Sequence, residues 1–243
     1  NPYLGMASGS GFANVEVEVA PNLRLSAGVT ERRLVRDFQR VTHAERSALS
    51  RVSDYQADAQ NLSVAYDLGK AVTVRASYTR LREPSALLGI QSLDVNDFAN
   101  GSTTQGGSLG AEVRPGAGFV LSGSATVGRT VAAGASQFRT GTGGLVGTAF
   151  QGAIAKEHVF DTNDRIRISI AQPLHLEGGT LDFTSLAVID RQTGELGQVT
   201  QSFEVGRPRR QLVGEFLYAR TLFNGAGEFD LFGRMQQHND AVA

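Results

Sequence analysis

The sequence predicts an all-β fold, an antiparallel up-and-down transmembrane β-barrel of the kind found in bacterial outer membranes. Three observations predict it: stretches of alternating apolar and polar residues, turn signals between pairs of stretches, and links that alternate between short and long. Successive side chains of a strand point to opposite faces, so each alternating stretch gives one apolar and one polar face. The 243 residues fit a single barrel domain that covers residues 1–243.

The first hairpin is predicted from residues 14–30. Val15 and Val17 alternate with Glu16 and Glu18, and a turn signal around Pro21 precedes a second alternating stretch over residues 22–30. Ahead of this hairpin, we expect residues 2–7 to form one more strand, which a Ser- and Gly-rich segment connects to it.

The same pattern predicts four further hairpins, at about residues 61–79, 108–127, 144–175 and 210–237. Helical periodicity is nearly absent, and only residues 43–60 could form a short helix within a loop. The Gly-rich segments 106–107 and 141–144 lack the Lys and the strand-to-helix context of a phosphate loop, so we interpret them as loop ends.

The links between the hairpins carry further information. Turns within the hairpins are short, whereas the links at about residues 34–56, 83–105, 131–143 and 176–209 are mostly long. Outer-membrane barrels combine short periplasmic turns with long extracellular loops, so the alternation predicts that location and orientation. The excursion at residues 176–209 is expected to contain its own hairpin, pairing about 179–189 with 198–206 beyond the membrane.

Five hairpins and the strand at residues 2–7 give eleven strands. Bacterial barrels made of one chain have an even number of strands. We therefore predict about twelve strands, with the last strand missing from this chain.

Each alternating stretch assigns its residues to two environments. Charged residues expected to line the lumen are Glu16, Glu18, Arg24, Arg75, Glu112, Arg165, Arg167, Glu228, Asp230 and Arg234. Apolar residues expected to face lipid are Val15, Val17, Leu25, Val64, Tyr66, Val74, Tyr78, Phe119, Ile166, Ile168, Ile170, Phe229 and Leu231.

Composition excludes several function classes. A net charge of −1 lacks the basic excess of a nucleic-acid-binding protein, and the absence of cysteine excludes disulfides and thiolate metal sites. The four histidines lack a metal-type spacing, and Asp161–Asp164 lacks the glycine and distal Glu of a calcium loop. We expect no catalytic residue, no cofactor and no metal, so the chain itself is not an enzyme.

The segment from Ile168 to His238 carries a family resemblance. It reads ISIAQPLHLEGG, then RRQLVGEFLYAR, then a glycine turn and RMQQH, and NPYL at the start and LRLSAGV at 23–29 look similar too. This pattern resembles the C-terminal region of subtilisin-type serine proteases from alphaproteobacteria, especially sphingomonads. The resemblance covers most of the chain, but its motifs are strand patterns. It implies an autotransporter-like translocator barrel that follows a protease domain.

The family's catalytic triad lies upstream of that region and has no counterpart in this chain. The terminal aromatic strand of a complete translocator is also absent here, which departs from the family. Nothing catalytic is therefore implied for these residues.

Three functions remain open from the sequence. The first is a passive translocator or anchor for an upstream passenger, a subtilisin-type protease, to which the chain is or was covalently joined. The second is a small outer-membrane porin, and the third is a soluble β-rich adhesion or binding domain. Under the first two, outer-membrane lipid and lipopolysaccharide are the expected partners. The basic run at residues 207–210 is interpreted either as a contact for lipopolysaccharide phosphates or as a solvated strand end.

Overall fold

A computed structural model of the chain describes residues 1–34, 55–92, 97–132, 137–206, 210–222 and 226–237. Over these ranges it contains one short helix and thirteen strands, which confirms the all-β class. All neighbouring strands pair antiparallel, as an up-and-down arrangement requires. No helix in the described ranges combines the length and the apolar character needed to cross a membrane.

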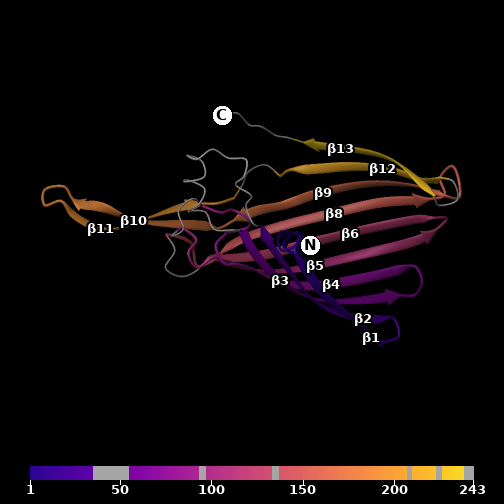
Figure 1. Cartoon of the computed structure of the whole chain (residues 1–243), viewed down its shortest axis with the longest axis horizontal. Coiled ribbons are helices and arrows are strands. Elements are labelled where there is room, and N and C mark those ends of the chain that lie inside the picture. Colours follow the sequence, from indigo (N-terminus) through magenta and orange to yellow (C-terminus); the bar gives the residue numbers. More distant parts are fainter. Residues whose placement is uncertain (35–54, 93–96, 133–136, 207–209, 223–225, 238–243) are drawn as a thin grey trace.

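The main sheet has ten strands, in the order β1-β2-β3-β4-β5-β6-β8-β9-β12-β13 (Figure 1). Its strands are β1 (Gly11–Ala20), β2 (Leu23–Leu34), β3 (Tyr55–Leu68), β4 (Val72–Glu83), β5 (Ser102–Gly116), β6 (Phe119–Ala132), β8 (Leu145–Glu157), β9 (Asp164–Gly178), β12 (Leu212–Leu222) and β13 (Gly227–Gln237).

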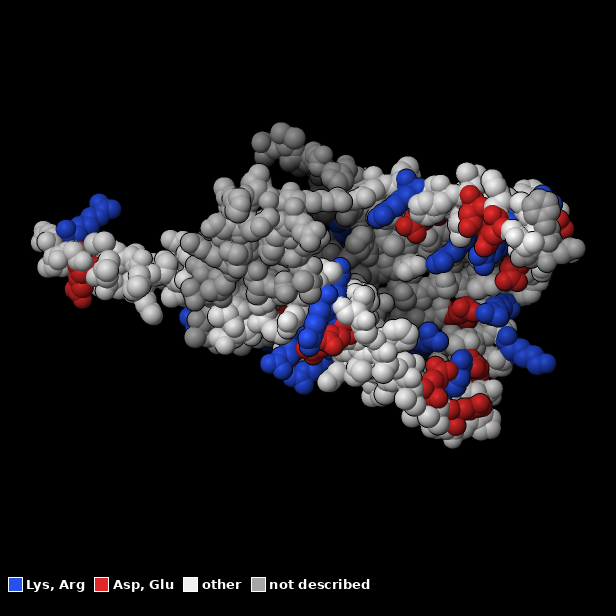
Figure 2. Space-filling model, in the orientation of Figure 1, with Lys and Arg blue, Asp and Glu red and all other residues white. Residues whose placement is uncertain are grey.

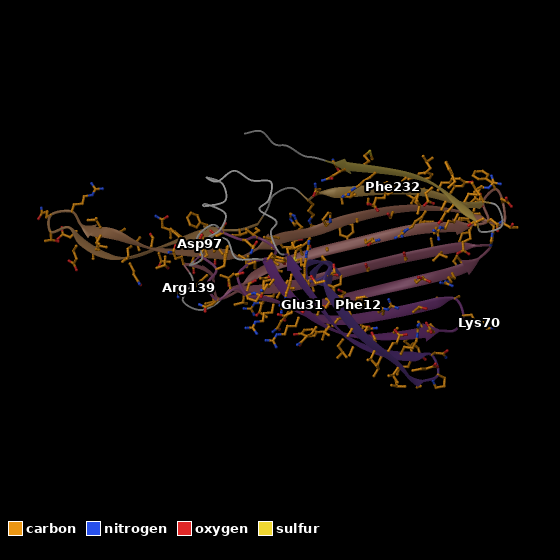
Figure 3. All side chains as sticks on the ribbon, in the orientation of Figure 1. Phe12, Glu31, Lys70, Asp97, Arg139 and Phe232 are labelled. Atoms are coloured by element: carbon orange, nitrogen blue, oxygen red, sulfur yellow. The ribbon has the colours of Figure 1, made fainter. Side chains whose placement is uncertain are left out.

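These ten strands are the five predicted hairpins. Short connections join their members, and a residue with positive φ lies at the turns of the first three, for example Asn22 (φ 68°), Gly69 (φ 71°) and Gly118 (φ 76°). Such a backbone suits Gly and Asn, because neither pays the full steric cost of the left-handed region. The short turns lie at one end of the sheet, where Figure 3 labels Lys70, and Asp97 and Arg139 lie at the other end. We call these the short-turn end and the long-loop end.

The prediction of a strand at residues 2–7 is wrong, because Pro2–Met6 forms the helix α1. The side chain of Asn1 accepts a hydrogen bond from the backbone N–H of Tyr3 at 3.1 Å, and Pro2 occupies the first turn of the helix. Asn is a preferred N-cap and Pro a preferred first helical residue, so both favour a helix start here. Without this strand, the odd count that implied a missing last strand no longer holds.

A second sheet lies at the long-loop end, in the order β11-β10-β7. Strands β10 (Thr180–Asp190) and β11 (Glu195–Glu204) form the hairpin predicted within residues 176–209, and it extends away from the main sheet (Figure 1). The third strand, β7 (Phe138–Thr140), was not predicted. The rings of Phe98, Phe138 and Phe183 stack at the base of this sheet, with centroids 5.7 and 4.8 Å apart.

The prediction of about twelve strands is also wrong, since ten strands form the main sheet and three form the second. Strands β1 and β13 are the two edges of the main sheet, and each pairs with one described neighbour. The described sheet is therefore an open, curled sheet.

Three smaller sequence-based expectations differ from the structure or lie partly outside the described ranges. The segment 106–107 is not a loop end but lies in the middle of β5. Residues 43–54 of the predicted short helix lie outside the described ranges, and residues 55–60 belong to β3. Of the basic run at 207–210, only Arg210 is described, and its guanidinium pairs with Glu177 at 3.0 Å.

Candidate functional site

The main sheet curls around α1. This five-residue helix or the residues beside it touch strands from β2 to β8: Thr30 of β2 donates a hydrogen bond to the carbonyl of Ala7, and Tyr3 reaches Gly147 of β8. One short helix can contact so many consecutive strands only if they bend around it. We call the face that holds α1 the concave face and the opposite one the convex face.

Tyr3 is seated against a row of three glycines on the concave face. Gly106, Gly128 and Gly147 are register partners on β5, β6 and β8. A Cβ added at Gly106 would lie 2.9 Å from the Tyr3 ring, and one added at Gly147 would lie 3.0 Å from the Tyr3 hydroxyl. A Cβ at Gly128 would collide with the ring as well. Tyr3 is 1% exposed, so glycine at these positions makes the space that the ring fills.

Polar contacts fix the start of the chain within the curl. The side-chain amide of Asn1 donates to the hydroxyls of Thr79 and Ser108, at 2.8 and 3.0 Å, and Thr79 in turn donates to Asn61. Around α1 the sheet presents small or apolar residues, and Tyr3, Ala57, Ala59 and Leu81 belong to one buried cluster. The helix therefore fills the concave face in the half nearer the long-loop end.

A buried carboxylate organises the same end of the molecule. Glu83, the last residue of β4, is fully buried. It accepts hydrogen bonds from the Tyr55 hydroxyl at 2.9 Å and from the backbone N–H groups of Leu88 at 2.9 Å and Gly89 at 2.7 Å, while the Ser102 hydroxyl adds a contact at 3.3 Å. Charged acceptors form the stronger hydrogen bonds of proteins, so this carboxylate holds segment 84–90 against the ends of β3 and β5.

The ten charged residues predicted to line the lumen all lie on the concave face, by the register that links them to the glycine row. They occupy the half nearer the short turns, and Figure 2 shows side chains of both signs gathered over that end. The concave face thus has two parts, one filled by α1 and one rich in charge.

Within the charged part, the structure brings only some of the predicted residues together. Arg24 pairs with Glu16 at 3.6 Å, and also with Asp67 at 3.2 Å. Arg165 pairs with Glu228 at 3.5 Å, although their strands are separated by β12. Arg234 pairs with Glu215 at 3.8 Å, and Glu112 with Arg114 at 2.8 Å. No ion pair within the described ranges involves Glu18, Arg75, Arg167 or Asp230.

The thirteen apolar residues predicted to face lipid lie on the convex face. Ten of them are exposed, for example Val15 at 65%, Ile168 at 58% and Leu231 at 54%, and Val64, Val74 and Ile166 are half-buried. No second layer of described residues covers these rows, because the three-stranded sheet lies at the long-loop end (Figure 1). What the rows contact in the cell stays a prediction.

No group of three or more His, Asp or Glu residues able to hold a metal ion occurs in the part of the chain that the structure describes. His158 and His175 are described, whereas His43 and His238 lie outside these ranges.

The packing of Tyr3 against the glycine row was not predicted. The signal for α1 was the Asn1-Pro2 pair, an N-cap residue followed by proline. No signal linked the three glycines, because they become neighbours only through the pairing of β5, β6 and β8.

Comparison with known proteins identifies no relative: no protein-family model, no curated protein and no solved structure matches the chain.

Proposed function

We propose that this chain is a bacterial outer-membrane β-barrel that serves as the translocator or anchor of a passenger protein, with no catalytic site of its own. The observation that carries the proposal is the reversed arrangement of the two faces. The convex face carries rows of exposed Val, Ile, Leu, Phe and Tyr, and the concave face carries the ten charged residues predicted for the lumen.

Exposing such apolar rows to water is unfavourable. Soluble monomers rarely expose contiguous apolar patches larger than a few hundred Å². Here the exposed apolar rows run from Val15 on β1 to Leu231 on β13, across the whole main sheet. Hydrocarbon accommodates these rows without cost, and a closed barrel also satisfies every backbone group in lipid. The third hypothesis, a soluble adhesion domain, would need another layer over the convex face.

Closure of the barrel is part of the proposal. Lipid does not tolerate an unpaired sheet edge, so the edges β1 and β13 need partners. Because the main sheet has ten strands, β1 and β13 run in opposite directions and can pair antiparallel with each other. The two edge strands carry Phe12 and Phe232, labelled in Figure 3.

The position of α1 favours an anchor over a porin. Tyr3 and the buried cluster around it fill the concave face near the long-loop end, where a solute pore needs an open path. The alternative of a small porin requires that α1 move away from the row of three glycines.

Heat-modifiable gel migration tests the proposal. A folded membrane barrel resists sodium dodecyl sulfate at room temperature, so the unheated chain is expected to migrate differently from the boiled chain after refolding in detergent. Ion conductance of the same preparation in planar bilayers should be low. Stable monomers in buffer without detergent would refute the membrane barrel, and high, steady conductance would favour the porin.

A further inference from the structure

A recess at the long-loop end of the convex face lies outside the concave site. It is lined by Asp58 and Gln60 of β3 and by Arg80 and Arg82 of β4, and its cavity volume is about 110 Å³. The backbone register explains why they meet, since Arg82 pairs with Asp58 and Arg80 with Gln60. Residues two apart on a strand share a face, so Arg80 and Arg82 lie on the same face of β4, with Cα atoms about 7 Å apart.

The recess borders the exposed apolar rows. Leu62 and Tyr78 are register partners two residues nearer the short-turn end on the same strands and face, and they are 58% and 48% exposed. The polar row continues sideways, because Arg80 pairs with Gln105 on β5 and Gln105 pairs with Arg129 on β6. Along the convex face, apolar side chains therefore give way to arginine and glutamine at this level.

The two arginines differ from about half of the other arginines that the structure describes. Arg24, Arg33, Arg114, Arg165, Arg210, Arg220 and Arg234 each have a carboxylate partner. Neither Arg80 nor Arg82 makes a hydrogen bond or an ion pair within the described ranges, although the Asp58 carboxylate lines the same recess. The four lining residues carry a net charge of +1, and both arginines are exposed.

From this placement we infer that the recess binds a phosphate of a phosphorylated glycolipid, the lipid A type of headgroup, with acyl chains along Leu62 and Tyr78. Guanidinium groups bind phosphate oxygens through paired, charge-assisted hydrogen bonds. Asp58 and Gln60 offer acceptors and a donor for the sugar hydroxyls beside the phosphate. The inference rests on the proposed function, because only a chain in the outer membrane meets this lipid on its convex face.

Binding of lipid A to the full chain in phosphatidylcholine nanodiscs tests the inference, with the variant R80Q/R82Q beside the wild type. We expect the variant to bind bis-phosphorylated lipid A at least tenfold more weakly. Dephosphorylated lipid A should bind both proteins equally weakly. The control variant K70Q/R191Q also removes two positive charges, at the turn between β3 and β4 and at the tip of the β10–β11 hairpin, and should bind like the wild type.

Several results would overturn the inference while leaving the membrane barrel intact. Equal binding by wild type and R80Q/R82Q would do so, as would an equal loss in K70Q/R191Q, which indicates unspecific attraction. Displacement of lipid A by millimolar inorganic phosphate would assign the recess to free phosphate instead. Heat-modifiable migration of each variant, measured in parallel, shows separately whether the barrel itself has formed.

Discussion

The ring of Tyr3 occupies the space that a side chain at Gly128 would need. Tyr3 lies in a helix at the start of the chain and Gly128 in the middle of β6, yet the two are as closely fitted as neighbours in a protein core. This contact, repeated at Gly106 and Gly147, couples α1 to three strands of the sheet.

Substitution of Gly128 by alanine should displace Tyr3. We expect G128A to lower the free energy of unfolding by about 1–3 kcal/mol, the usual cost of overpacking. Urea unfolding, followed by tyrosine fluorescence, measures it. G107A is the matched control, because a Cβ at Gly107 on the same strand pair meets nothing within 4 Å.

The contact between Tyr3 and Gly128 predicts that substitutions at these two positions affect the free energy of unfolding non-additively. Y3A should lower the free energy of unfolding by about 3–5 kcal/mol because it leaves a cavity, as other large-to-small changes of buried aromatic residues do. In the Y3A background, G128A should have almost no further effect, because the colliding ring is gone. If the two substitutions lower the free energy of unfolding additively in Y3A/G128A, Tyr3 does not pack against Gly128.

The buried Glu83 carboxylate should govern the order of segment 84–90. E83A removes the acceptor for the N–H groups of Leu88 and Gly89, and an unsatisfied buried donor costs about 1–3 kcal/mol. Amide hydrogen exchange of these two residues should therefore become much faster in E83A. E195Q, at the exposed start of β11, is the control and should leave both rates unchanged.

Asp161 in the turn between β8 and β9 provides a pH-dependent prediction. The backbone N–H of Thr162 and then the Arg220 guanidinium hold the pKa of this carboxyl below its usual range. Its stabilisation of the turn is therefore complete above the usual Asp pKa and is lost as the pH falls through the lowered value. NMR titration of the Asp161 carboxyl should show the low pKa, and R220Q should raise it only in part, because the Thr162 contact remains.

The ring stack of Phe98, Phe138 and Phe183 should anchor the second sheet. The Thr184 backbone N–H donates to the Gln137 carbonyl at 2.9 Å beside this stack. F138A should speed hydrogen exchange at Thr184 while exchange in β5 and β6 stays unchanged. Equal rates in F138A and wild type would show that the rings do not hold the sheet in place.

The hairpins could be predicted from the sequence because their signal is local. In residues 14–30, for example, alternation and a turn at Pro21-Asn22 lie within one short window, and strand pairing follows directly. The hairpin of β10 and β11 was predicted on the same basis. Strand ends were less predictable, as with β3, which starts at Tyr55 rather than near residue 61.

Features that depend on distant parts of the chain could not be predicted. The helix start at Asn1-Pro2 has a local signal, but the glycine row that receives Tyr3 forms only when β5, β6 and β8 pair. For the charged residues of the concave face, the alternating pattern predicted the face but not the ion pairs. Arg165, for example, pairs with Glu228 across an intervening strand. The Arg80–Arg82 recess likewise exists only because register brings Asp58 and Gln60 beside it.

The most direct test of the central claim uses two adjacent residues of β9, Arg167 and Ile168, which lie on opposite faces of the sheet. The chain contains no cysteine, so R167C and I168C can each carry a single environment-sensitive fluorophore without background. After insertion into lipid bilayers, nitroxide groups on the acyl chains should quench the label at position 168, and aqueous iodide should quench the label at position 167. Quenching of the label at 168 by iodide, with no effect of the acyl-chain nitroxides, would contradict the membrane barrel.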